Sequence, residues 1–191
     1  YITVNADITQ SATAPAARLT LNANQDITIN NAISMTKSGS KLELNAGNSS
    51  NGGNVTLAGT VNADTVSMNL TGAGSVTQTT ALSTNNLRIA GTGTQVTLAD
   101  TSNNIGVVAA NVASINLKTQ EGIDLGSIYG KGLSVDTVEG MSGVTATGNI
   151  NLASRTGNIF VKQNISTSST SNSAIELNAG EAASVGANTG P

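Results

Sequence analysis

The stretch LTLNANQDITINNAISM, residues 19–35, contains short apolar units separated by polar turns. In the first unit, residues 19–21, and in the second, residues 27–29, the outer positions are aliphatic and the middle one is Thr. A third aliphatic position follows at Ile33. Alternation over a few residues is the period of a β-strand, whose successive side chains point to opposite faces. The stretch therefore predicts three short strands joined by turns.

The same pattern returns along the chain. A first series of apolar units starts at Leu19, Leu42, Val66, Leu87, Ile115, Leu133, Ile150 and Ile175. A second series falls between its members and starts at Ile27, Val55, Val76, Val96, Ile123, Val144 and Ile159. A weaker third position follows at Ile33, Val61, Leu82 and Ile165. Members of the first series start about 22 residues apart, which is in the period range of solenoid proteins.

Three strands per repeat and about eight repeats predict an all-β fold, a parallel β-helix or β-solenoid. Each strand would pair with its equivalents one coil above and below, so that inward aliphatic residues form the core and outward Thr, Ser, Asn and Glu form ladders on the surface. No window keeps the spacing of an amphipathic helix for long, so helix is a minor component at most.

The repeats predict one domain over residues 19–191, with residues 1–18 as a partial coil or an irregular lead-in that contains Pro15. Two stretches rich in Asn, Gly, Ser and Thr, residues 45–54 and 167–173, are expected to be loop insertions that project from the rod. Because the chain starts at Tyr1 without an export signal, we interpret it as a fragment of a larger protein.

A short motif strengthens the case for repetition. The sequence ELNAG occurs at residues 43–47 and again at residues 176–180. Its Asn45 and Asn178, together with Asn22, follow a unit of the first series. Asn tolerates a left-handed backbone and bonds nearby backbone groups, so these residues are expected to stack at turns.

Composition excludes several classes of protein. Aromatic residues are 2% and charged residues 10%, so the core must be aliphatic. The net charge of -3 is scattered, which leaves no basic stripe for nucleic acid or an anionic membrane. No apolar run approaches the ~20 residues needed for membrane insertion. The chain has neither His nor Cys, which removes the usual catalytic triads and zinc ligands.

Carboxylates remain as candidate chemistry. The nearest acidic group, with two lysines close in sequence, comprises Glu121, Asp124, Asp136, Glu139, Lys118 and Lys131. Clustered acids beside a base on one strand face are typical of β-helical enzymes that cleave acidic polysaccharides. Sparse solvated charge that keeps a rod soluble is the alternative we favour. The sequence therefore assigns no catalytic, cofactor-binding or metal-binding residue and no cofactor.

Two other surface features are candidates for binding or modification. If the second series stacks in register, one outward face carries Thr28, Thr56, Thr77, Thr97 and Thr145. Such a column resembles the Thr arrays of ice-binding solenoids, although Thr is also a good residue for an exposed strand. Asn-x-Ser/Thr glycosylation acceptors occur at Asn48, Asn54, Asn69 and Asn164, a number that chance also explains in so polar a chain.

The sequence GNINLASRTGNI, residues 148–159, resembles the repeat of filamentous-haemagglutinin-type exoproteins, and NVTLAGTVNA, residues 54–63, is similar in style. The resemblance implies a right-handed parallel β-helical shaft, secreted to the cell surface by Gram-negative bacteria through a two-partner or autotransporter-type route that uses an outer-membrane transporter. It also implies roles in adhesion, biofilm formation or toxin display. The Asn-Pro motifs of the family's secretion domain are absent, so this chain would be shaft.

We therefore expect a non-catalytic structural segment of a secreted bacterial adhesin or exoprotein. It would be a monomer with a tendency to associate end to end, and its receptor or glycan is not located by the sequence. An ice-binding or polysaccharide-acting β-helix is the alternative.

Overall fold

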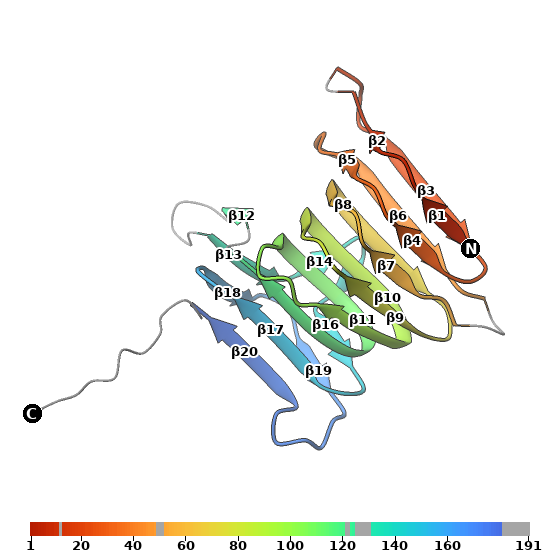
Figure 1. The fold of residues 1–191 in the computed structure, drawn as a ribbon. Helices are drawn as coiled ribbons and strands as arrows, with labels where there is room; N and C mark the ends of the chain where they lie inside the picture. The colour runs from red at the N-terminus through yellow and green to blue at the C-terminus, as the bar shows by residue number, and fades with distance from the viewer. Residues whose placement is uncertain (12, 49–51, 121–122, 125–130, 181–191) are drawn as a thin grey trace, which may run out of the picture.

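The computed structural model describes residues 1–11, 13–48, 52–120, 123–124 and 131–180 (Figure 1). The side chains of residues 123, 124 and 131 are not described. Within this part of the chain the structure is all β, with no helix. Parallel strands stack as the coils of a β-solenoid of about 7 turns, and β1 and β20 lie at opposite ends of the rod (Figure 1). The predicted fold class is confirmed, with one turn fewer than expected.

Equivalent strands of successive coils form three columns, which we name A, B and C in chain order. Column A contains β1 (Ile2–Val4), β4 (Ile27–Ile29), β7 (Val55–Leu57), β9 (Ala73–Gln78), the last parts of β10 (Leu82–Leu98) and β11 (Asn104–Thr119), β17 (Ile150–Ser154) and β20 (Ile175–Ala179). Each coil begins in column A, so β1 opens coil one and β17 opens coil seven.

Columns B and C complete each coil. Column B contains β2 (Ile8–Thr9), β5 (Ile33–Met35), the first part of β8 (Val61–Leu70), and the first parts of β10 and β11. Column C contains β3 (Arg18–Ala23), β6 (Lys41–Ala46), the later part of β8, the middle parts of β10 and β11, β16 (Val144–Ala146) and β19 (Ile165–Thr167). In coils six and seven, β13 (Lys131–Val135) and β18 (Asn158–Val161) pair with each other and lead into column C.

Two short antiparallel pairs depart from this plan. β12 (Ile123–Asp124) pairs with the start of β13. β14 (Thr137–Val138) and β15 (Met141–Ser142) form a hairpin between Val135 and Val144. No pattern in the sequence indicated this hairpin, which interrupts column C in coil six.

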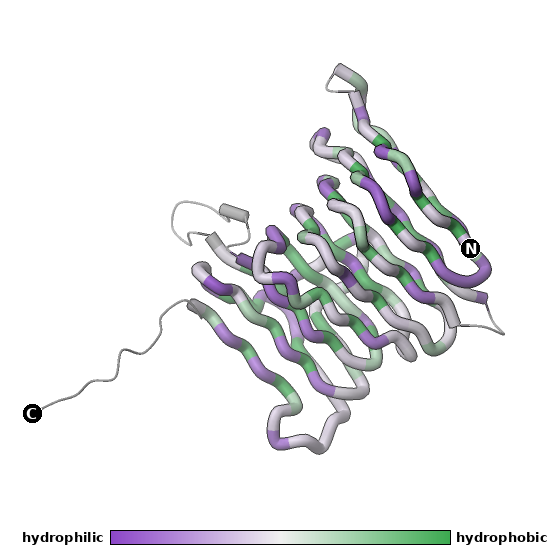
Figure 2. The backbone as a smooth tube through the Cα atoms, viewed as in Figure 1, coloured by the Kyte–Doolittle hydropathy of each residue, from purple (hydrophilic) through white to green (hydrophobic). Residues whose placement is uncertain are grey.

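The core is a continuous stack of aliphatic side chains inside the three columns. Alternate residues of the central strands are buried, and Figure 2 shows apolar and polar residues alternating along the coils. In β6, for example, Leu42 and Leu44 are fully buried while Lys41 and Glu43 lie on the outer side. Since each buried aliphatic side chain contributes roughly 1.5–3 kcal/mol, repeated layers of similar volume are enough to hold the coils together.

The predicted assignment of strands to series was wrong in the second half of the chain. Leu87 of column C pairs with Val108, whereas the first series continued from Leu87 to Ile115. Ile115 lies in column A and pairs with Val96 and Ile150. The physical reason is that β10 and β11 run through two corners of the coil without a break, which removes the polar turns that separate strands elsewhere.

The predicted Asn turns were also only partly right. Asn22 and Asn45 stack in register, but they lie within β3 and β6 and not at turns. Asn178 lies in column A, opposite Ala153. The left-handed residues are the glycines that end the two ELNAG motifs, Gly47 at φ 87° and Gly180 at φ 70°. Gly is favoured there because it has no Cβ to clash.

The ends of the predicted domain follow the same plan. β1 and β2 pair in register with β4 and β5, so residues 2–9 belong to the first coil.

The β19–β20 connection, which includes most of the predicted insertion at residues 167–173, extends beyond the strand ends (Figure 1). Of the other predicted insertion, residues 49–51 lie outside the described part of the chain.

Candidate functional site

The outer side of column C carries a connected network of amide and charged side chains, and we name it the polar face. Alternation places three side chains of each strand on this face, so coils one to five form a grid of three ranks. The ranks are Arg18, Lys41, Thr65, Asn86 and Val107; Thr20, Glu43, Ser67, Arg88 and Ala109; and Asn22, Asn45, Asn69, Ala90 and Asn111.

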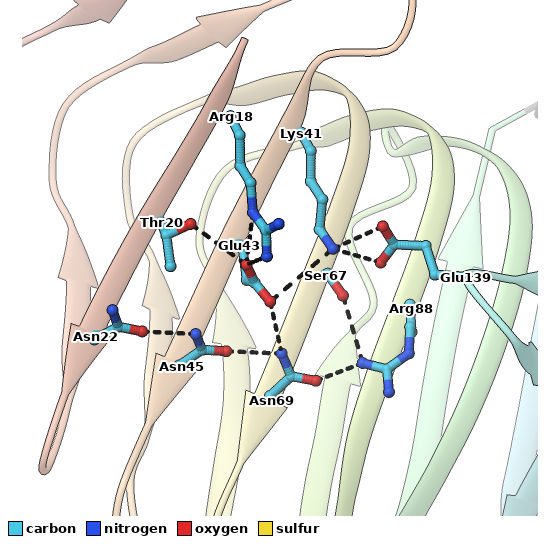
Figure 3. Close-up of polar contacts among 10 residues, drawn as sticks. All are labelled: Arg18, Thr20, Asn22, Lys41, Glu43, Asn45, Ser67, Asn69, Arg88 and Glu139. Atoms are coloured by element: carbon cyan, nitrogen blue, oxygen red, sulfur yellow. Dashed lines mark hydrogen bonds and ion pairs between the residues drawn. The ribbon is translucent and has the colours of Figure 1, made fainter.

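An amide ladder runs along the third rank (Figure 3). The Nδ2 of Asn45 donates to the Oδ1 of Asn22 at 2.7 Å, and the Nδ2 of Asn69 donates to the Oδ1 of Asn45 at 2.7 Å. The guanidinium of Arg88 donates to the Oδ1 of Asn69 and ends the ladder. Stacked Asn side chains can do this because each amide has both a donor and an acceptor along the rod axis.

Glu43 is the centre of an ion-pair network on the same face (Figure 3). The Nε of Arg18 donates to the Oε2 of Glu43 at 3.0 Å, and the Nζ of Lys41 lies 4.0 Å from the Oε1 of Glu43. The hydrogen bond from Arg18 holds the pKa of Glu43 below its ordinary value, against the opposing effect of partial burial, and the positive charge of Lys41 acts in the same direction. Glu43 is therefore held as a paired carboxylate, which is unsuited to act as a general acid at neutral pH.

A second carboxylate reaches this network from far along the chain. The Nζ of Lys41 lies 2.7 Å from the carboxylate of Glu139, at the tip of the β14–β15 hairpin (Figure 3). The other acid of the hairpin, Asp136, pairs with Lys162 at 3.7 Å. Two members of the acidic group noted in the sequence thus bind different lysines, each as half of an ion pair.

The structure describes only part of what remains of that group. Asp124 and Lys131 are antiparallel partners in the backbone pairing of β12 and β13, Lys118 lies near the end of β11, and Glu121 lies outside the described residues. Among the residues that the structure describes, no three metal-ligating side chains come together.

The outer side of column A carries a ladder of hydroxyls. Thr28, Thr56, Thr77 and Thr97 stack in register as predicted, and Thr3 extends the ladder at its start. The sequence did not identify Thr3 because its coil was treated as irregular. The predicted fifth member, Thr145, was wrong, because it lies in column C between Asn111 and Ser166. The ladder continues through Asn116, Asn151 and Glu176.

The four glycosylation acceptors lie in different surroundings. Asn69 is half-buried and bonded in the amide ladder, and the Nδ2 of Asn54 donates to the Oδ1 of Asp26 at 2.9 Å. Asn164 is exposed next to β19, and Asn48 is half-buried with a partner of its own. A glycan on Asn69 would replace one of the two Nδ2 hydrogens and place a sugar within the ladder, so this acceptor is the least compatible with the structure.

One buried polar residue that the sequence did not identify is Asn103, at the corner between columns A and B. Its Nδ2 donates to the Oε1 of Gln78 at 2.9 Å and to two backbone carbonyls, and its Oδ1 accepts from the backbone N–H of Leu82 at 2.7 Å. With every polar atom paired, Asn103 stabilises the corner and leaves no group free for chemistry.

Comparisons with known proteins do not assign the chain to a family. No family model matches the sequence, no curated protein is similar to it, and no solved structure matches its fold. The described residues also include no helix with the length and apolar character needed to cross a membrane.

Proposed function

We propose that this chain is a structural shaft segment of a secreted bacterial surface adhesin or exoprotein, without catalytic activity of its own. The observation that carries the proposal is the continuous stack of about 7 parallel coils over an unbroken aliphatic core. In such a stack each coil is held mainly by its neighbours, so the rod can be lengthened by repetition and can fold progressively. A shaft needs these properties, and it needs no binding chemistry along its sides.

The location and the partner are part of the same proposal. The resemblance of residues 148–159 to filamentous-haemagglutinin repeats supports export to the cell surface, where the rod would hold an adhesive or toxic domain away from the cell. Its receptor, on a host or a bacterial surface, would then be bound by the displayed domain. Ile175 and Leu177 are about two-fifths exposed on β20, which supports weak end-to-end association.

Insertion of one extra coil tests the shaft. A second copy of residues 150–174 placed after residue 174 repeats one full turn, because Ile150 and Ile175 occupy equivalent positions in column A. We expect a rod longer by about 4.8 Å with equal or higher thermal stability, measured by small-angle X-ray scattering and calorimetry. Loss of folding on insertion would contradict a rod built by repetition. Turnover of an acidic polysaccharide that disappears in Asp136→Asn would contradict the non-catalytic role.

A second candidate, binding to ice or to a crystalline surface, is favoured by one observation. Five Thr residues stack in unbroken register on column A, about 4.8 Å apart. The test is thermal hysteresis in Thr56→Tyr, with Thr145→Tyr as the matched control, since Thr145 is an exposed Thr outside the ladder. Hysteresis lost only in Thr56→Tyr would favour this function, and its absence in the unaltered protein would exclude it.

A further inference from the structure

The hairpin β14–β15 lies across the outside of the solenoid. It leaves column C in coil six, and β14 lies over β10 and β11 of the preceding coils (Figure 1). Its strands pair Thr137 with Ser142 and Val138 with Met141, which leaves Glu139 and Gly140 as a two-residue turn. The hairpin therefore points back along the rod towards the N-terminal coils.

Burial shows that the hairpin packs on the polar face. Two outward residues of this face are as buried as the inward core. Ala109 is 0% exposed and Ser67 is 1% exposed. Val138 of the hairpin is only 3% exposed, yet neither Val138 nor Ala109 belongs to the inner core cluster. A small apolar contact thus exists on the outside of the rod, beneath the hairpin.

The side chain of Glu139, at the tip of the hairpin, contacts the side chain of Lys41 in coil two. Coils six and two are four steps apart, which is about 19 Å at the spacing of paired strands. The three residue steps from Asp136 to Glu139 cover only about 10 Å of that distance even when extended. Long side chains cover the remainder, because the carboxylate of Glu139 meets the Nζ of Lys41 at 2.7 Å.

The backbone at the tip has an unfavourable conformation at Glu139, the residue that makes this contact. Glu139 has φ 49° and Gly140 has φ 79°, and Glu139 is the only residue other than Gly with positive φ in the described chain. Two-residue turns with positive φ at both positions prefer Asn, Asp or Gly at the first, because Asn and Asp bond nearby backbone groups and Gly has no Cβ to clash. Asn or Gly would make the turn more easily, but neither would reach Lys41 with a negative charge.

We propose that the β14–β15 hairpin is a clamp that ties coil six to coil two and makes coils two to six open as one unit. A solenoid without such a contact has only nearest-neighbour interactions, so that coils near an end open independently of those further along. The clamp adds one interaction across three intervening coils. It would act whether or not the rod displays another domain, so it does not depend on the proposed shaft function.

Native-state hydrogen exchange tests the clamp in Glu139→Gly. This change removes the carboxylate and relieves the backbone strain, so a hairpin with only a local role would exchange as slowly as before or more slowly. The clamp predicts roughly two- to fivefold faster exchange of the backbone amides of β6 and the later part of β8, as expected for loss of a partly exposed ion pair. Amides of β17, outside the clamped coils, serve as the internal reference and should not change.

Two further variants separate the ion pair from the packing. Lys41→Met should reproduce the faster exchange, and the double variant Lys41→Met, Glu139→Gly should be no faster than Lys41→Met alone, which also removes the contact of Lys41 with Glu43. Val138→Asp should detach the hairpin and accelerate exchange in coils two to five together. Unchanged exchange in β6 and β8 in all of these variants, with the fold retained in circular dichroism, would overturn the clamp.

Discussion

The outer sides of columns A and C differ sharply although their inner sides are alike. Both columns place aliphatic residues inward at every coil, and both stack in register over most of the rod. Column A presents a neutral ladder of Thr, whereas column C presents an amide ladder, an ion-pair network and a packed hairpin (Figure 3). This difference indicates that the inward side chains stabilise the fold. The outward side chains are free to differ in chemistry from one column to the next.

The largest expected effect comes from breaking the inner side that the two columns share. Leu44→Asp in column C and Ile150→Asp in column A each place a charge where the native side chain is fully buried. We expect each to cost more than about 4 kcal/mol and to unfold a block of coils, because a buried unpaired charge is severely destabilising. Chemical denaturation followed by circular dichroism measures the loss. A mild effect at either position would show that the assigned facing is wrong.

The amide ladder gives the next largest effect, and only on column C. Asn45→Ala removes the hydrogen bonds to Asn22 and to Asn69 and leaves their amide atoms without that partner. We expect a loss of about 1–2 kcal/mol in the free energy of unfolding. Asn111→Ala is the matched control, since Asn111 is an exposed member of the same rank, and should change stability by less than about 0.5 kcal/mol. Equal losses would mean that the ladder contributes nothing.

The ion pairs of the polar face predict a dependence on pH. Because the folded-state pKa of Glu43 is lowered by Arg18, the folded protein binds fewer protons at this group than the unfolded chain. The stabilisation is therefore fully present above the unfolded pKa of about 4.3 and is lost as pH falls through the folded pKa. We expect a small effect, because the Arg18 side chain is 61% exposed and solvent screens the pair.

Urea denaturation at pH 7 and at pH 3 measures this term as a difference between the protein and its Glu43→Gln variant. The variant should lose less stability than the unaltered protein on acidification. If both lose the same amount, the pairing of Glu43 makes no net contribution.

The smallest effect is expected on the outer side of column A. Thr56→Ala removes a hydroxyl and a methyl group from a half-buried surface position within the ladder. We expect a change in the free energy of unfolding of less than about 0.5 kcal/mol, caused mainly by the lower strand propensity of Ala. If the melting temperature fell as far as in Leu44→Asp, the distinction between inner and outer positions would be wrong.

The architecture could be predicted from the amino-acid pattern alone. Alternation of aliphatic and polar residues, separated by Asn, Gly and Ser turns, is a local signal that repeats, so it indicated parallel strands stacked around an aliphatic core. It also identified which residues of each strand point inward, as at Leu44 and Ile150. These features depend on a few neighbouring residues, and a local pattern is enough to specify them.

The column that each strand joins could not be predicted from the pattern and is known from the three-dimensional structure. All three columns carry the same pattern of apolar residues, so assigning Ile115 to column A or to column C leaves its inward and outward positions unchanged. Where β10 and β11 pass the corners without turns, no sequence signal counts the columns. The contact of Glu139 with Lys41 joins residues 98 positions apart, and it depends on where a hairpin comes to lie on the finished surface. Such a contact follows from the stacking of five coils, which is a property of the whole fold.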